Sequence, residues 1–196
     1  MKLTETDDRT LVKQSQLGDK EAFRQLMERY QDRVFNSVYR IIGDADEADN
    51  LLQETFFKAY KALDQFKQES QFSTWLYRIA MNNCASYLRK LKTVKHQKLL
   101  SLDTAWGGGE DSGKLQMADK TITPYEELVG SERQMVIQNA ITELEPDLRR
   151  IVVLKDVENY SYEEIAEIIG CPMGTVKSRL FKAREQLRER LKRLLP

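Results

Sequence analysis

Apolar residues recur at three- and four-residue steps through most of this chain, which is the spacing of one face of an α-helix. One such series runs from Phe23 to Ile41 and stops at Gly43-Asp44, and Asp19 is its expected N-cap. A second series runs from Ala48 to Leu63. No segment alternates apolar and polar residues as a half-buried strand would. The periodicity therefore predicts an all-α fold.

A third helix is expected after a polar loop between Gln65 and Gln71. Ser73 is a suitable N-cap for this helix, and its apolar residues begin at Trp75 and continue to Leu91. Together the three helices predict one helical domain over residues 5–95.

Residues 96–122 lose the periodicity and include the run Gly107-Gly108-Gly109, which is typical of a flexible linker. A segment of this length without regular structure is unusual inside a compact domain. The helical pattern resumes near Pro124. We therefore predict two small helical domains joined by a flexible linker, the second covering residues 123–196.

The net charge of zero conceals a local imbalance. From Pro172 to the end, eight basic and two acidic side chains give a charge of +6. The preceding stretch, Leu144 to Cys171, has three basic and seven acidic side chains and a charge of −4. A neutral chain with one basic element indicates a local contact with nucleic acid.

A helix-turn-helix is expected at the start of this basic element. Ser161 and Glu164 have the spacing of a capping box, so a helix should begin after Ser161. Gly170 can take the positive φ of a tight turn, and Pro172 then opens a second helix. The second helix of such a motif lies in the DNA major groove.

The second helix should bury an apolar stripe that runs from Val176 through Leu180, Ala183 and Leu187 to Leu191. Basic, hydroxyl and aromatic side chains lie outside the stripe and are suited to phosphates, base edges and thymine methyl groups. They are Lys177, Ser178, Arg179, Phe181 and Lys182. The plain alternative, a merely solvated basic surface, does not account for the cap and the turn glycine.

The first domain carries a second group of residues suited to nucleic acid. Arg78, Asn82, Ser86 and Arg89 recur along one polar stripe of the third helix. The aromatic residues cluster around the preceding loop and are Phe66, Phe72, Trp75 and Tyr77. Rings that stack on bases, next to cations that follow phosphates, suit a single strand. Core packing remains the simpler interpretation of Trp75, and the position of Asn82 alone leaves both interpretations open.

Other classes of function have little support in the sequence. The single histidine, His96, has no cysteine or carboxylate at ligand or triad spacing, and the glycine run lacks the lysine of a phosphate loop. We therefore expect no enzyme, no cofactor and no metal. The polar N-terminus and the short apolar runs argue against a signal peptide and membrane insertion. Cys84 and Cys171, without CxxC spacing, suit the cytoplasm.

Three ordered motifs resemble the extracytoplasmic-function branch of the sigma-70 family, close to its sigma-E-like members. The first is Leu52-Gln53-Glu54-Thr55-Phe56, and the second is Phe72-Ser73-Thr74-Trp75-Leu76-Tyr77-Arg78-Ile79-Ala80. The third runs from Ser161 through Ala166 and on to Gly174-Thr175-Val176-Lys177-Ser178-Arg179. The resemblance covers essentially the whole chain outside the linker.

The resemblance implies a sigma factor that gives RNA polymerase its promoter choice. It implies that the first domain, region 2, binds the clamp helices of the largest polymerase subunit through Asn50, Gln53, Glu54 and Phe57. The loop and helix bearing Phe66, Phe72, Tyr77, Arg78 and Asn82 would read the melted −10 element and capture a flipped base. The second domain, region 4, would read the −35 duplex with Thr175, Lys177, Ser178, Arg179, Phe181 and Lys182.

The resemblance also implies further partners, namely the flap of the second largest polymerase subunit and an anti-sigma protein. Two departures are visible. Asn50 replaces an aspartate that many family members carry, so one charge is lost from the polymerase contact. Lys177 and Lys182 stand where relatives often carry arginine, which would weaken bidentate guanine recognition. A freestanding helix-turn-helix regulator is the alternative, although it leaves the features of the first domain unexplained.

Overall fold

The computed structural model describes residues 6–102 and 126–194, and within these ranges it contains helices and no strands. This confirms the predicted all-α class with two helical domains. The first domain consists of α1 (Asp8–Gln16), α2 (Lys20–Ile42), α3 (Ala45–Ala62), the 3-10 turn η1 (Leu63–Gln65) and α4 (Phe72–Leu102). The second consists of α5 (Glu126–Thr142), α6 (Pro146–Val152), the π-helical turn η2 (Val153–Val157), α7 (Tyr162–Ile169) and α8 (Met173–Leu194).

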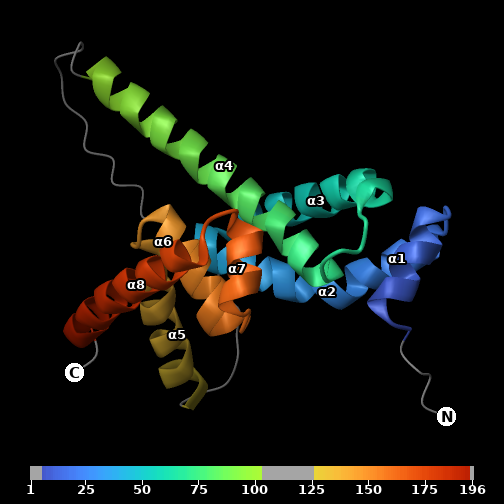
Figure 1. The fold of residues 1–196 in the computed structure, drawn as a ribbon. Coiled ribbons are helices and arrows are strands. Elements are labelled where there is room, and N and C mark those ends of the chain that lie inside the picture. The colour runs from blue at the N-terminus through green and yellow to red at the C-terminus, as the bar shows by residue number, and fades with distance from the viewer. Residues whose placement is uncertain (1–5, 103–125, 195–196) are drawn as a thin grey trace.

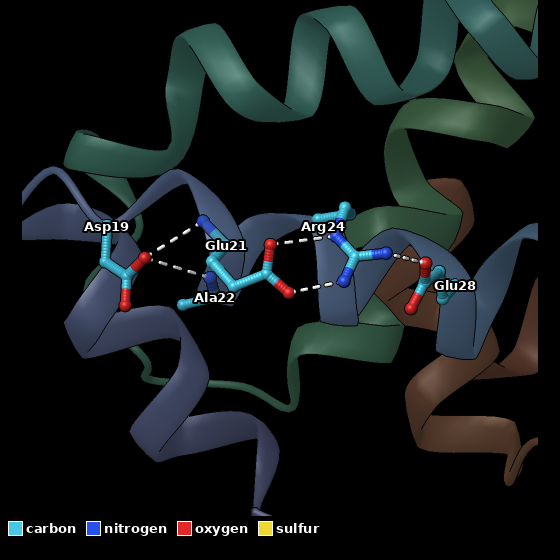
Figure 2. Close-up of polar contacts among 5 residues, drawn as sticks. All are labelled: Asp19, Glu21, Ala22, Arg24 and Glu28. Atoms are coloured by element: carbon cyan, nitrogen blue, oxygen red, sulfur yellow. Dashed lines mark hydrogen bonds and ion pairs between the residues drawn. The ribbon is translucent and has the colours of Figure 1, made fainter.

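Helix α2 begins and ends where the sequence predicts. The Asp19 carboxylate accepts hydrogen bonds from the backbone N–H groups of Glu21 (2.9 Å) and Ala22 (3.3 Å), as Figure 2 shows. Along the first turns, Arg24 pairs with Glu21 on one side and with Glu28 on the other (Figure 2). These exposed pairs support the helix weakly. Gly43 closes it at φ 83°.

The expected N-cap of α4 is wrong. The helix begins at Phe72, one residue before Ser73, and the Trp75 N–H donates to the Gln71 carbonyl at 3.1 Å. The Ser73 hydroxyl lies 3.5 Å from the Gln71 side-chain oxygen instead of capping the helix. The helix also continues to Leu102, into the segment predicted as linker. The rest of that segment lies outside the described residues.

Helix α1 was not expected from the sequence, because its nine residues are too few to show a clear periodicity. Asp7 caps it by accepting from the Thr10 N–H at 2.7 Å. Leu11 and Val12 are buried against the rest of the first domain. The Gln16 side chain donates to the carbonyls of Leu63 and Phe66, at 2.8 and 3.0 Å. This helix thereby fixes the end of η1, from which the loop to α4 departs.

The two domains pack against each other. Helix α7 lies against α4, and the far half of α4 extends beyond the other helices (Figure 1). The buried apolar side chains of both domains form one continuous cluster. Cys84 belongs to this cluster, and its burial raises the thiol pKa to about 12, as expected for an inert core residue.

Candidate nucleic-acid interface

The helix-turn-helix has the predicted geometry. The Ser161 hydroxyl accepts from the Glu164 N–H at 3.1 Å, while the Glu164 carboxylate accepts from the Ser161 N–H at 2.8 Å. Gly170 ends α7 at φ 72°, and its N–H donates to the Ala166 carbonyl. Helix α8 follows after Pro172. The capping box and the turn glycine therefore set the start of α7 and the position of α8.

Helix α8 buries the first part of the predicted stripe, leaves its last residue, Leu191, half-buried, and keeps the predicted DNA face outside the stripe. Val176, Leu180 and Ala183 are buried, and Leu187 packs against them. The remaining candidate residues surround the opposite side of the helix, with Phe181 exposed to 71%. Lys177, Ser178 and Lys182 are exposed, and Thr175 and Arg179 are half-buried. A basic helix face with one prominent ring is thus open to a large partner.

Several of the basic side chains on α8 are paired with carboxylates of the same domain. Arg179 lies 3.5 Å from Asp147, and Lys182 lies 3.5 Å from Glu145. Both pairs are solvent-exposed, and such pairs contribute about 1 kcal/mol or less. DNA phosphates can therefore easily replace these carboxylates as partners of Arg179 and Lys182.

The aromatic residues before α4 form a compact cluster. Phe66 and Trp75 are stacked with ring centroids 4.7 Å apart, and Phe72 meets Trp75 at 5.8 Å and Tyr30 at 5.5 Å. Phe66 and Phe72 are buried, and Trp75 is partly buried against the core. This confirms the core interpretation of Trp75.

A surface hollow of about 480 Å³ opens beside this cluster. Phe66, Gln68, Gln71 and Phe72 line it from the loop side, and Arg29 and Tyr30 line it from α2. Gln68 has a φ of 57°, so the loop turns sharply here. The walls combine rings with amide groups, and Asp7 and Asp8 of the α1 end add carboxylates, of which Asp8 pairs with Arg29 and accepts from the Tyr30 hydroxyl. The rings and amide groups are suited to a nucleobase.

The candidate residues on α4 lie in different environments. Asn82 is exposed, and Arg78 is half-exposed and bound to Glu167 of α7 at 2.6 Å. Tyr77 is fully buried where the two domains meet, and its burial raises its pKa above the ordinary value. The Tyr77 ring contacts Tyr160 at 5.2 Å, edge to face. In this arrangement only Asn82 is freely accessible.

The four candidate polymerase residues share one exposed face of α3. Asn50, Gln53, Glu54 and Phe57 follow helical spacing, and Phe57 is exposed to 58%. Beside them runs a groove of about 640 Å³ between α2 and α3, lined by apolar residues that include Phe23, Met27 and Tyr60. An exposed apolar groove with a polar edge is typical of a protein interaction site.

A polar network that runs from this face to the buried residues Thr55 and Asn83 was not predicted. The Lys58 ammonium donates to the Asn83 side-chain oxygen at 2.6 Å and pairs with Glu54 at 2.7 Å. The Asn83 amide donates to the Thr55 hydroxyl at 3.0 Å. The network joins α3 to α4, and only the polar character of Thr55 and Asn83 at inward-facing positions could have indicated it.

A search of the described residues finds no group of three His, Cys, Asp or Glu side chains that could hold a metal ion. Of the helices in residues 6–102 and 126–194, none is both long and apolar enough to cross a membrane.

Comparisons with known proteins agree on one family. Residues 26–94 match the family described as Sigma-70 region 2, and residues 134–187 match Sigma-70, region 4. The chain is 37% identical over 188 residues to the ECF RNA polymerase sigma-E factor of Haemophilus influenzae, which covers 96% of this chain and 97% of that protein. It is 36% identical over 194 residues to the RNA polymerase sigma-H factor of Pseudomonas aeruginosa, with 98% of each chain covered.

Among solved structures, the chain is similar to the sigma factor RpoE from Bartonella quintana, crystallised with the anti-sigma factor NepR. The TM-score is 0.65 at 28% identity, and the match covers 87% of this chain and 96% of that one.

Proposed function

This chain belongs to the extracytoplasmic-function branch of the sigma-70 family and is an RNA polymerase sigma factor. We propose which of its surfaces bind polymerase, the −10 element and the −35 element. The observation that carries the proposal is the full-length similarity to sigma-E factors, because it covers both helical domains. We assign residues 5–95 to region 2, 96–122 to a linker and 123–196 to region 4.

Region 4 reads the −35 element as duplex DNA. The exposed face of α8 offers Lys177, Ser178 and Phe181, and its neighbours Thr175, Arg179 and Lys182 flank them. Lysine and arginine bind phosphates or guanine edges, and a ring packs on a thymine methyl group. Because two of the cations are lysines, recognition depends on single contacts more than on bidentate ones.

Region 2 reads the −10 element as a single strand. Phe66 and Phe72 form the floor of the hollow beside the loop, and a base flipped out of the strand can enter it. Arg78 and Asn82, on the adjoining face of α4, then contact the backbone and a base edge, and Tyr77 joins them once it is uncovered. Unstacking one base costs on the order of a few kcal/mol, which stacking and hydrogen bonding offset.

The exposed face of α3 binds polymerase. Gln53 and Glu54 supply polar contacts to the clamp helices of the largest subunit, with Asn50 and Phe57 on either side. Region 4 contacts the flap of the second largest subunit. The structurally similar RpoE was solved with an anti-sigma factor. We extend this to an anti-sigma partner for the present chain, which acts in the cytoplasm and has no catalytic role of its own.

Run-off transcription tests the assignment. The purified chain is added to sigma-free bacterial core polymerase on genomic fragments that include the promoter of its own gene. We expect discrete transcripts whose yield falls roughly 10-fold in Asn82→Ala, since one base contact is worth about 1–3 kcal/mol. The control Asn139→Ala, an exposed asparagine on α5, should transcribe normally.

Polymerase docking is tested separately by pull-down of core enzyme. Gln53→Ala should weaken binding, while Gln14→Ala, an exposed glutamine on α1, should not. Equal core binding by all variants would remove α3 from the assignment. Tight binding of one duplex by the isolated chain, without core binding or transcripts, would favour the freestanding regulator.

A further inference from the structure

Helix α4 carries a stretch of one-sided charge, of which the contacts proposed above use only Arg78. From Ser70 to Leu102 the sequence has six basic side chains and no acidic one, and therefore a charge of +6. The chain as a whole has 31 side chains of each kind. Solubility requires charge of either sign, so a stretch without any carboxylate indicates a negatively charged partner.

Most of this charge lies on the half of α4 beyond Asn82, which extends past the other helices (Figure 1). Arg89, Lys90 and Lys92 are exposed there. None of the three forms an ion pair with any residue whose side chain the structure describes. The cations of α8, in contrast, have carboxylates of their own domain within 3.5 Å. The charge on α4 is therefore open to a partner outside the described residues.

The three exposed cations lie on the same side of α4 as Asn82. Successive residues turn about 100° around a helix, which places Arg89, Lys90 and Lys92 each within about 80° of Asn82. The apolar side chain of Leu91, which is 40% exposed, lies on the opposite side. We call Arg89, Lys90 and Lys92 the basic face of α4. It continues the surface assigned to the −10 strand and is separate from the apolar side of the helix.

The length of α4 sets which part of a promoter this face can reach. Lys92 follows Asn82 by ten residues, which is about 15 Å along the helix axis. At 3.4 Å per base pair, this corresponds to roughly three to four base pairs from the base that Asn82 contacts. From α4 the chain continues through the linker to region 4, whose −35 element lies upstream. The DNA beside the basic face is therefore the paired DNA upstream of the melted −10 element.

We propose that the basic face of α4 binds the phosphates of the promoter duplex immediately upstream of the −10 element. This inference rests on the proposed function of α4 as the helix that reads the −10 strand. Ammonium and guanidinium groups bind phosphate oxygens whatever the base, so the face adds affinity without adding sequence preference. Each phosphate contact also releases counterions from the DNA, which makes promoter affinity more sensitive to salt.

Salt titrations of the assembled polymerase test the proposal. Core polymerase carrying the original chain or a variant is titrated against a fluorescent promoter fragment, taken from a promoter mapped by run-off transcription. Its −10 element is mismatched, so that DNA opening does not enter the measured affinity. The variants are Lys92→Gln and the triple variant Arg89→Gln/Lys90→Gln/Lys92→Gln, since glutamine keeps the helix propensity. The matched control Lys13→Gln removes an exposed charge from α1.

We expect the dependence of log affinity on log salt to become shallower by about 1 in Lys92→Gln and by about 3 in the triple variant. Lys13→Gln should keep the original slope. A second fragment carries uncharged methylphosphonate linkages in the three to four base pairs upstream of the −10 element. The original chain should bind this fragment about as weakly as the triple variant binds the normal one, and the triple variant should bind both fragments alike.

Unchanged salt slopes in the variants of the basic face would overturn the proposal. Equal weakening of the original chain and the triple variant by the uncharged linkages would also overturn it, because the phosphates would then have other partners. Weaker pull-down of core polymerase by the triple variant would place the face against polymerase instead of DNA. In all three cases, promoter binding that falls in Asn82→Ala would leave the proposed function of α4 intact. An original holoenzyme that binds the promoter fragment no better than an unrelated one would overturn that function as well.

Discussion

Asn82 and Asn83 are neighbours on α4 and face opposite environments. Asn82 points to solvent on the face assigned to the −10 strand. Asn83 is buried, where it accepts from Lys58 and donates to Thr55. The sequence indicated the exposed position through its polar stripe. It did not indicate the buried one, because the partners of Asn83 come from α3, more than 20 residues earlier.

This pair separates a structural role from a binding role. Asn83→Ala should lower the free energy of unfolding by about 1–3 kcal/mol, because it leaves the buried Thr55 hydroxyl and the Lys58 ammonium without this partner. Asn82→Ala should change it by no more than about 0.5 kcal/mol. Urea unfolding followed by circular dichroism measures both. Equal losses of unfolding free energy in the two variants would mean that the hydrogen bonds of Asn83 contribute nothing specific to stability.

At the level of elements, the sequence predicted those helices whose ends carry their own signals. Asp19 and Gly43 bound α2, and the capping box with Gly170 bounds α7, as predicted. Helix α1 was missed because it is short, and Ser73 was assigned as a cap although Gln71 provides the first carbonyl of α4. Side-chain caps are visible in a sequence, whereas a backbone carbonyl is not specific to any residue.

The turn between α7 and α8 gives a prediction at this scale. Gly170 has a φ of 72° and no atom within 4 Å of an added Cβ, so Gly170→Ala meets only backbone strain. That strain should cost roughly 1–2 kcal/mol. Gly174→Ala, inside α8 and equally free of contacts, should stabilise the chain by up to about 1 kcal/mol. Thermal unfolding should give a lower midpoint for Gly170→Ala and a higher one for Gly174→Ala. A lower midpoint in both variants would show that steric crowding at the turn, and not only backbone strain, disfavours a side chain there.

At the scale of the whole molecule, the sequence predicted two domains but not their contact. Separate regions of charge were visible, with an acidic stretch before the basic helix. Which carboxylates meet region 2 depends on η2, a π-helical turn whose five residues have no distinctive pattern. Only the folded chain brings Glu158, Arg149 and Gln138 together against helix α2.

Two glycines test this contact independently of charge. Gly43 and Gly18 both have positive φ, 83° and 96°, so alanine is strained at either position. Only at Gly43 does an added Cβ meet the other domain, 2.8 Å from the Thr142 methyl carbon. Gly43→Ala should therefore weaken the contact and increase the fraction of open molecules, which raises the mean radius of gyration above the roughly 16 Å of a compact chain of this length, whereas Gly18→Ala should only lower stability.

The second substitution Thr142→Ser removes the methyl group that Gly43→Ala would strike. Small-angle scattering of the double variant should return the radius to that of the original chain, while the strain at residue 43 and its cost in stability remain. If Gly43→Ala and Gly18→Ala leave the radius equally unchanged, the domains do not hold this contact in solution. If both raise it, general unfolding is responsible. Expansion in Gly43→Ala alone, reversed by Thr142→Ser, would show that the free chain keeps its two promoter-reading domains closed on each other.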